Sequence, residues 1–199
     1  MSASLPILAC FLAGLLLARF GLAPEALLRH DPTLPALWLL MALVGLSLGA
    51  DRRLGEILRS LRPRVLLLPL GTTVGTFAGC ALMSVFLVYS VADCLAVGAG
   101  FAYYSLSSVF ITQYRGEELG TVALLANIFR ELFTLIFTPL LVRLCGAPAP
   151  VMCGGASTMD TTLPVITRAA GTAWAFPAIV HAMVLDFSVP FWVTLFCGL

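Results

Sequence analysis

The sequence predicts an all-α, polytopic membrane protein, and composition, hydropathy and segment length are the three observations behind this prediction. Of the 199 residues, 60% are hydrophobic and 11% are charged, whereas about a quarter of a soluble domain is charged. The mean hydropathy is +1.04, and the apolar runs approach the roughly 20 residues that cross a bilayer as a helix. The net charge is +1, and the Arg residues lie scattered in short loops, which excludes nucleic-acid binding.

Charges and Gly or Pro breaks divide the chain into apolar segments. We expect these segments at residues 5–22, 34–50, 65–89, 92–113, 119–142, 149–167 and 173–197. The segment at 149–167 contains several breaks, so it either crosses the membrane as an interrupted helix or re-enters from one side. The expected count is therefore about six or seven spans, in one membrane domain over residues 1–199.

Arg residues set the expected orientation. The stretch 51–64 is rich in Arg, and the positive-inside rule places it in the cytoplasm. The N-terminus then lies inside and the C-terminus outside, although Arg143 falls on the outer side against the rule. No positive charge precedes the first apolar segment, so we expect that segment to be retained and not cleaved as a signal peptide.

The six Cys residues lie in apolar or Gly/Pro sequence and lack the spacing of metal ligands. We interpret them as small buried hydrophobic residues. No metal and no cofactor are expected.

Four charged residues, Arg130, Glu131, Asp160 and Asp186, lie deep in apolar sequence. A charge at membrane depth costs about 2.5 to 3.5 kcal/mol even on the lenient insertion scale, so such residues pair or line a water-filled cavity. Each of the four is therefore a candidate functional residue.

One helical face of the fifth apolar segment carries polar residues at spacings of three and four: Asn127, Arg130, Glu131, Thr134 and Thr138. In one interpretation, Arg130 and Glu131 neutralise each other or bridge helices. In the other they line a site, where Glu131 faces the ligand and Arg130 orients it or contacts backbone carbonyls. Adjacent residues point about 100° apart on a helix, which favours separate partners.

The stretch 145–168 combines helix breakers with polar side chains. Its breakers include Gly154 and Gly155, and its polar groups include Ser157, Thr158, Asp160 and Thr161. Interrupted backbone at membrane depth is tolerated only where it is buried in protein or lines a cavity, and transporters use it to present free N–H and C=O groups to ligands. We therefore expect a site here. The alternative is a structured loop outside the membrane that carries an Asp turn.

The fourth and the last apolar segments also carry polar residues, which serve either helix packing or a functional site. Tyr104 and Ser105 lie in the fourth segment, where small hydroxylated residues serve tight helix packing at least as well as ligand contact. His181 and Asp186 are five residues apart and do not share a helical face. His181 is either a hydrogen-bonded packing residue or a proton relay, and Asp186 requires a partner.

The chain also carries a series of recognisable strings: VGLSLGADRRLGEIL (44–58), GFAYYSLSS (100–108), LLANIFREL (124–132), CGGASTMDTTLPVI (153–166) and PAIVH (177–181). In this order they resemble motifs of the bacterial lysine exporter family, LysO type. The resemblance covers essentially the whole chain and matches the C-terminal two thirds of longer members. The chain therefore resembles a short form that lacks the N-terminal spans.

The resemblance implies an exporter of L-lysine, and of analogues such as thialysine, in the bacterial inner membrane. By similarity, the acidic residues of two of its motifs are Glu131 and Asp160. Some members are split into a short and a longer polypeptide. Three alternatives follow for this chain. It transports by itself, as a monomer or homo-oligomer, or it transports together with a short membrane partner. In the third alternative it does not transport and only stabilises a partner carrier. A crossing partner for the interrupted segment is expected in the first segment or in the missing spans.

The mechanism we expect is secondary antiport. Glu131 and Asp160 would alternately hold a proton and the substrate ammonium, because a low-dielectric cavity favours the neutral carboxylate. The expected coupling ion is H⁺, with Na⁺ as the alternative. N–H groups at residues 154–157 would bind the substrate carboxylate. An intramembrane protease that pairs Asp160 with Asp186 is a remote alternative, because the G-x-G-D motif is absent, and we expect no enzyme.

Overall fold

The computed structural model describes residues 63–199, together with residues 16, 17, 19, 20, 39 and 46. The first two expected segments lie, apart from these single positions, outside the described residues. So does nearly all of the Arg-rich stretch from which the orientation was inferred. Residues 63–199 fall within one compact unit, Gly55–Leu199, and the description below concerns this unit.

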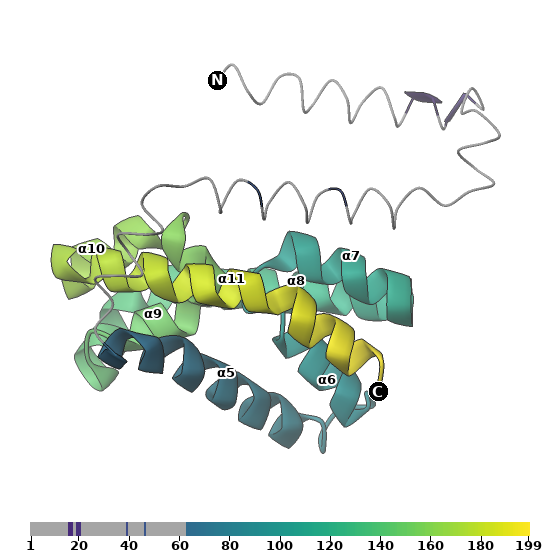
Figure 1. Ribbon diagram of the computed structural model, residues 1–199, viewed down its shortest axis with the longest axis horizontal. Coiled ribbons are helices and arrows are strands. Elements are labelled where there is room, and N and C mark those ends of the chain that lie inside the picture. The colour runs from purple at the N-terminus through teal and green to yellow at the C-terminus, as the bar shows by residue number, and fades with distance from the viewer. Residues whose placement is uncertain (1–15, 18, 21–38, 40–45, 47–62) are drawn as a thin grey trace. The chain divides into compact units, whose positions relative to one another are not determined.

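Residues 63–199 are helical and contain no strand. The elements are α5 (Pro63–Met83), α6 (Val91–Gly98), α7 (Tyr104–Arg115), α8 (Glu117–Cys145), α9 (Ala149–Gly154), η1 (Gly155–Met159), α10 (Leu163–Ala170), η2 (Thr172–Trp174) and α11 (Ala175–Cys197). Figure 1 shows α5, α8 and α11 as the long helices. These three, α11 together with η2, are long and apolar enough to cross a membrane. The prediction of an all-α membrane protein is confirmed.

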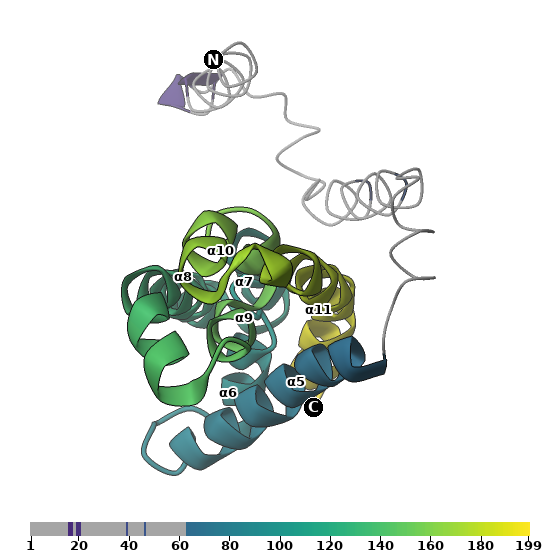
Figure 2. The same cartoon turned by 90° about the vertical axis from the view of Figure 1, so that its left-hand side faces the viewer.

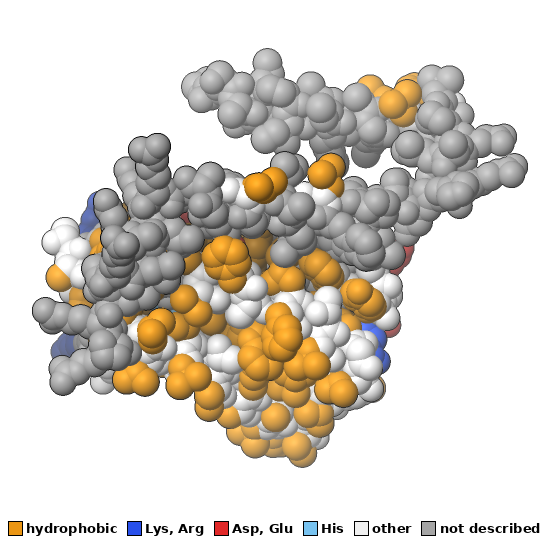
Figure 3. All heavy atoms as spheres, viewed as in Figure 1, with side chains coloured by type: hydrophobic (Ala, Val, Ile, Leu, Met, Phe, Trp, Pro, Cys, Tyr) orange, Lys and Arg blue, Asp and Glu red, His pale blue; other side chains and the backbone are white. Residues whose placement is uncertain are grey.

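The long helices expose large apolar side chains. Leu67 on α5, Ile136 on α8 and Phe191 on α11 are each more than half exposed, at 61%, 68% and 61%. Figure 3 shows one face on which hydrophobic side chains gather, with charged side chains at its margins. An apolar surface of this extent marks an interaction surface, and for helices of this length the bilayer is the fitting environment.

The fourth expected segment is not one helix, which corrects the prediction of a continuous span at 92–113. It consists of α6 and α7, separated by a break at residues 99–103. Phe101 and Ala102 have φ angles of 44° and 71° in this break, a conformation that residues other than Gly seldom adopt. The sequence signal for the break is the pair Gly98 and Gly100, which the apolar pattern around it hides.

The interrupted segment expected at 149–167 is confirmed as α9, η1 and α10. Its break meets the break between α6 and α7, because the N–H of Ala156 donates to the carbonyl of Phe101 at 2.8 Å. α9 itself packs against α8 and α5 (Figure 2). Within residues 63–199, the interrupted segment therefore meets the break between α6 and α7. The expected partner in the first segment or in further N-terminal spans lies outside the described residues.

A short turn joins α7 to α8, and the two helices pack along each other. Gly116 makes the turn with a φ of 93°. On α8, the missing side chain of Gly120 leaves the space that Thr112 of α7 occupies. Small residues thus bring the two helices close together, as is common in membranes.

Polar groups gather near this turn. Arg115 lies 3.7 Å from a carboxylate oxygen of Asp93 and donates to the carbonyl of Cys197 at 3.2 Å. The Tyr89 hydroxyl donates to Glu118 at 3.0 Å, and this bond raises the pKa of Tyr89. These contacts tie the α7–α8 end to α6 and to the end of α11.

The described Cys residues are free thiols with different burial. Cys94 and Cys197 are buried, Cys80 and Cys153 are partly buried, and Cys145 is exposed. The interpretation of all Cys residues as buried is therefore wrong for Cys145. This residue is the last of α8, where the side chain lies beyond the packed part of the helix.

Candidate functional site

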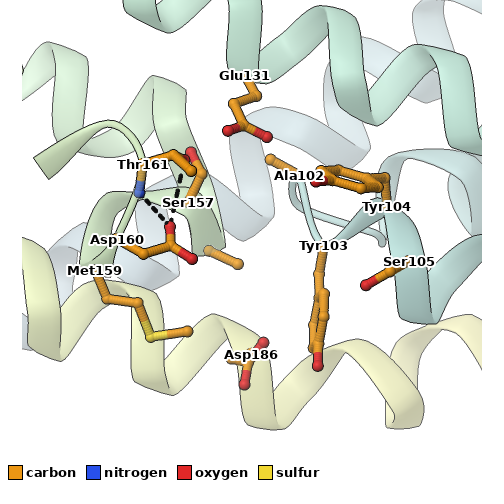
Figure 4. A pocket seen from close by; sticks show the side chains of 11 residues that line it. Ala102, Tyr103, Tyr104, Ser105, Glu131, Ser157, Met159, Asp160, Thr161 and Asp186 are labelled. Carbon is orange, nitrogen blue, oxygen red and sulfur yellow. Dashed lines mark hydrogen bonds between the residues drawn. The ribbon is translucent and has the colours of Figure 1, made fainter. Parts of the chain in front are cut away.

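A polar cavity of about 210 Å³ lies where the two breaks cross. Figure 4 shows its lining, which comes from the α6–α7 break, α8, the α9–α10 break and α11. The lining residues are Ala102, Tyr103, Tyr104, Ser105, Glu131, Ala156, Ser157, Met159, Asp160, Thr161 and Asp186. The cavity is smaller than the roughly 300 to 1,000 Å³ of drug-sized pockets, so it suits a small molecule.

Three carboxylates from three elements face this cavity. Glu131 comes from α8, Asp160 from the end of η1 and Asp186 from α11 (Figure 4). Asp186 is only 8% exposed, Glu131 is partly buried and Asp160 is exposed. Among the described residues that line the cavity there is no Arg, Lys or His. An acidic lining without a basic residue attracts cations.

The three carboxylates are spread around the cavity. Within residues 63–199 no group of three His, Cys, Asp or Glu side chains is close enough to hold a metal ion. Asp160 accepts hydrogen bonds from the Thr161 N–H at 2.6 Å and the Thr161 hydroxyl at 3.3 Å. In the described part of the chain, no hydrogen bond or ion pair reaches the carboxylates of Glu131 and Asp186. These two groups are free to bind a ligand.

The candidate residues from the sequence divide into two sets. Those that line the cavity are Tyr104, Ser105, Glu131, Ser157, Asp160, Thr161 and Asp186. Those that do not are Asn127, Arg130, Gly154, Gly155, Thr158 and His181. The members of the second set contact other parts of the structure.

Arg130 points toward backbone carbonyls. It donates from Nε to the carbonyl of Cys153 at 2.8 Å and from Nη2 to that of Met152 at 3.2 Å. Its Nη1 donates to the Thr76 hydroxyl at 3.2 Å, and its guanidinium lies over the Phe101 ring at 5.8 Å. Arg130 therefore ties α8 to α5, α9 and the α6–α7 break, and it does not pair with Glu131.

Asn127 holds the α6–α7 break. Its Oδ1 accepts the N–H of Ala102 at 2.8 Å, and its Nδ2 donates to the carbonyls of Val97 and Ala123 at 3.0 and 2.9 Å. The side chain is 3% exposed. Asn127 thus supports the cavity wall from behind and does not belong to the lining.

His181 is fully buried and joins three elements. Its Nε2 lies 2.8 Å from the Thr72 hydroxyl, and its Nδ1 lies 3.4 Å from the Thr158 hydroxyl. The Thr158 hydroxyl donates its hydrogen bond to the carbonyl of Gly155 or Ala178. Its oxygen can therefore only accept a hydrogen bond from Nδ1 of His181. A ring with a polar contact at each nitrogen suits a packing residue, and His181 does not line the cavity.

The glycines of the break have steric roles. A side chain at Gly154 would meet Thr134 and Thr158, and one at Gly155 would overlap the Phe101 carbonyl. The N–H of Ala156 already donates to that carbonyl. Of the N–H groups at 154–157 that we expect to bind a substrate carboxylate, the one of Ala156 is therefore not open to it.

Ala102, Tyr103, Ala156 and Met159 also line the cavity, and the sequence did not single them out as candidate site residues. Ala102 and Tyr103 enter the site through the α6–α7 break, so the glycines that mark this break were the available signal. Met159 is the last residue of η1, and nothing in its own pattern distinguishes it from a core residue.

The fold and the site define a class: a polytopic helical membrane protein in which two interrupted helices cross beside an acidic cavity. Interrupted helices at membrane depth are typical of transporters. The chain belongs to the lysine exporter LysO family, whose model matches residues 8–197.

Two relatives in curated collections resemble the chain. It is 32% identical over 180 residues to "Lysine exporter LysO" of Escherichia coli (strain K12), covering 88% of this chain and 59% of that protein. It is 31% identical over 124 residues to a "Putative lysine exporter" of Haemophilus influenzae (strain ATCC 51907 / DSM 11121 / KW20 / Rd), covering 62% and 63%. The chain thus spans less than two thirds of these relatives. No solved structure matches it.

Proposed function

We propose that the chain exports L-lysine, and analogues such as thialysine, across the bacterial inner membrane. The observation that carries this proposal is the acidic cavity, in which Glu131, Asp160 and Asp186 face one space without a basic residue in the lining. Membership of the family and the names of the relatives point to the same substrate.

The spread of the carboxylates supports a substrate with two separated positive charges. Lysine carries an α-ammonium and an ε-ammonium at opposite ends of a flexible chain. Carboxylates gathered at one point would favour a metal ion, whereas those of the described residues are not gathered in this way. Separate carboxylates match separate ammonium groups.

Coupling to protons follows from competition at the carboxylates. Three negative charges around a small cavity repel one another, and lysine brings only two ammonium groups. A proton on Glu131 or Asp160 removes the charge that holds an ammonium. A proton and the substrate ammonium then cannot occupy the same carboxylate together. A proton that binds from the outside therefore releases lysine to the outside, which produces antiport. Na⁺ is the alternative coupling ion.

The test is export of labelled L-lysine from loaded cells of an exporter-deficient bacterium that expresses the chain. We expect Glu131→Gln and Asp160→Asn each to lower the export rate at least about tenfold, the effect of one lost charged hydrogen bond. Glu117→Gln is the matched control, because Glu117 is an exposed residue of the same helix outside the cavity. The proposal fails if both cavity variants export at the rate of this control.

A further inference from the structure

The amino end of α7 opens into the acidic cavity. Tyr104 and Ser105 are the first two residues of this helix and belong to the cavity lining. The residue before them, Tyr103, makes no side-chain hydrogen bond to cap the helix. In the described part of the chain, the N–H groups of Tyr104 and Ser105 donate to no acceptor. Uncapped N–H groups and the helix dipole together favour an anion at this point.

Asp186 supplies an independent indication of a ligand. Its side chain is 8% exposed, lines the same cavity and has no hydrogen-bond partner among the described residues. A buried carboxylate without a partner is costly, and a cationic ligand would offset this cost. The cavity therefore offers a site for an anion at the amino end of α7 and a site for a cation at Asp186 of α11.

Figure 4 shows how these groups are arranged. Tyr104 and Ser105 lie on one side of the cavity, and Asp160 lies on the opposite side. Asp186 projects from α11 between them, and Glu131 projects from α8 across from Asp186. An amino acid with its α-carbon near Asp186 would extend its side chain away from α7, toward Asp160 and Glu131.

We propose that the amino end of α7 and Asp186 recognise the α-carboxylate and the α-ammonium of the substrate. This assignment rests on the proposed function and adds the orientation of the amino acid within the site. The N–H groups of Tyr104 and Ser105 and the Ser105 hydroxyl bind the carboxylate, while Asp186 binds the α-ammonium. Asp160 and Glu131 remain for the ε-ammonium. The site thus selects free amino acids over diamines and amides of the same length.

Three ligands separate these contacts in a binding assay with the purified full chain. L-lysine has all three charged groups, L-lysinamide lacks the carboxylate, and 6-aminohexanoate lacks the α-ammonium. We expect the unsubstituted protein to bind L-lysine at least about tenfold more tightly than L-lysinamide, the effect of one charge-assisted hydrogen bond. Equal affinity for the two would overturn the assignment of the carboxylate.

Two substitutions of one residue isolate the backbone donor. Ser105→Pro removes the N–H, and proline is tolerated in the first turn of a helix, as Pro164 is in the first turn of α10. Ser105→Ala keeps the N–H and removes the hydroxyl. We expect Ser105→Pro to remove most of the preference for L-lysine over L-lysinamide, with L-lysinamide binding unchanged as the sign of an intact fold. Ser105→Ala should retain most of the preference.

Asp186→Asn tests the other contact. It should weaken the binding of L-lysine and of L-lysinamide about tenfold or more, and leave the binding of 6-aminohexanoate unchanged. The proposal is wrong if Asp186→Asn weakens the binding of all three ligands equally. It is also wrong if the Ser105→Pro protein keeps the full preference for L-lysine over L-lysinamide. A chain that binds no L-lysine would instead overturn the proposed function. If Ser105→Pro fails to fold, the ligand preference of the unsubstituted protein and the Asp186→Asn series still decide.

Discussion

Arg130 and Glu131 are neighbours in the chain, yet their side chains reach different environments. Glu131 faces the cavity, and Arg130 donates to the carbonyls of Met152 and Cys153 at the end of α9. The angle of about 100° between adjacent helical residues explains this separation. Of the charged residues that the sequence places deep in apolar surroundings, only the acidic ones therefore belong to the site. Arg130 is a positioning residue for its wall.

At this scale we predict that Arg130→Lys destabilises the fold by about 1 to 3 kcal/mol. A Lys ammonium does not reproduce the fork of a guanidinium, so at least one buried carbonyl loses its donor. The measurement is denaturant unfolding of the purified protein in detergent. Arg143→Lys serves as control, because Arg143 is exposed on the same helix. Equal stability of the two variants would show that the carbonyl contacts contribute little.

Among the elements, the two interrupted helices build the site together. The break of α6–α7 contributes Ala102 and Tyr103, and the break of α9–α10 contributes Asp160. They are held in contact by the bond from the Ala156 N–H to the Phe101 carbonyl. The left-handed conformation of Ala102 costs free energy. Asn127 offsets part of this cost, because its Oδ1 accepts a hydrogen bond from the Ala102 N–H.

We predict that Gly155→Ala separates the two breaks. Gly155 has a φ of 63°, and an added Cβ would overlap the Phe101 carbonyl. The backbone cannot move there without breaking the contact between the two breaks. We therefore expect the free energy of unfolding to fall by about 3 kcal/mol or more. The fraction of monodisperse protein after size-exclusion chromatography and its unfolding midpoint measure the effect. Gly75→Ala on α5 is the control, since nothing lies within 4 Å of its added Cβ. A Gly155→Ala protein as stable as this control would contradict the crossing.

On the scale of the whole molecule, an apolar exterior surrounds the acidic cavity. Exposed residues such as Leu67 and Ile136 cover the long helices, while the cavity carboxylates range from buried Asp186 to exposed Asp160. A charged group in such surroundings is retained for a function or a partner. The cavity is the place where we propose that a cation and a proton compete.

We predict that lysine export from right-side-out membrane vesicles rises when the outside is acidified. Protons from the outside neutralise Glu131 or Asp160 and release the ammonium, so a larger inward proton gradient speeds export, and a protonophore abolishes it. Glu131→Gln vesicles should lose most of this response, because one proton acceptor is missing. Export that follows an imposed Na⁺ gradient and ignores the pH gradient would contradict proton coupling and favour the sodium alternative.

Much of the architecture could be predicted from the sequence. Hydropathy locates α5, α8 and α11, and the glycines and prolines of 149–167 indicate an interrupted helix there. The burial of charge selects Glu131, Asp160 and Asp186 as candidates before any coordinates are known. These features are local, because hydropathy, helix breaking and the cost of a buried charge depend on a short window of residues.

The tertiary structure alone decided how these parts combine. The break at 99–103 is stable because Asn127 binds the Ala102 N–H and because Phe101 accepts from Ala156. Both contacts join residues far apart in the chain, so no short window of sequence contains them. The same long-range packing brings three carboxylates to one cavity and turns Arg130 away from it. Local hydropathy determines that this chain resides in a membrane, whereas contacts between distant segments decide which of its charged residues line one cavity.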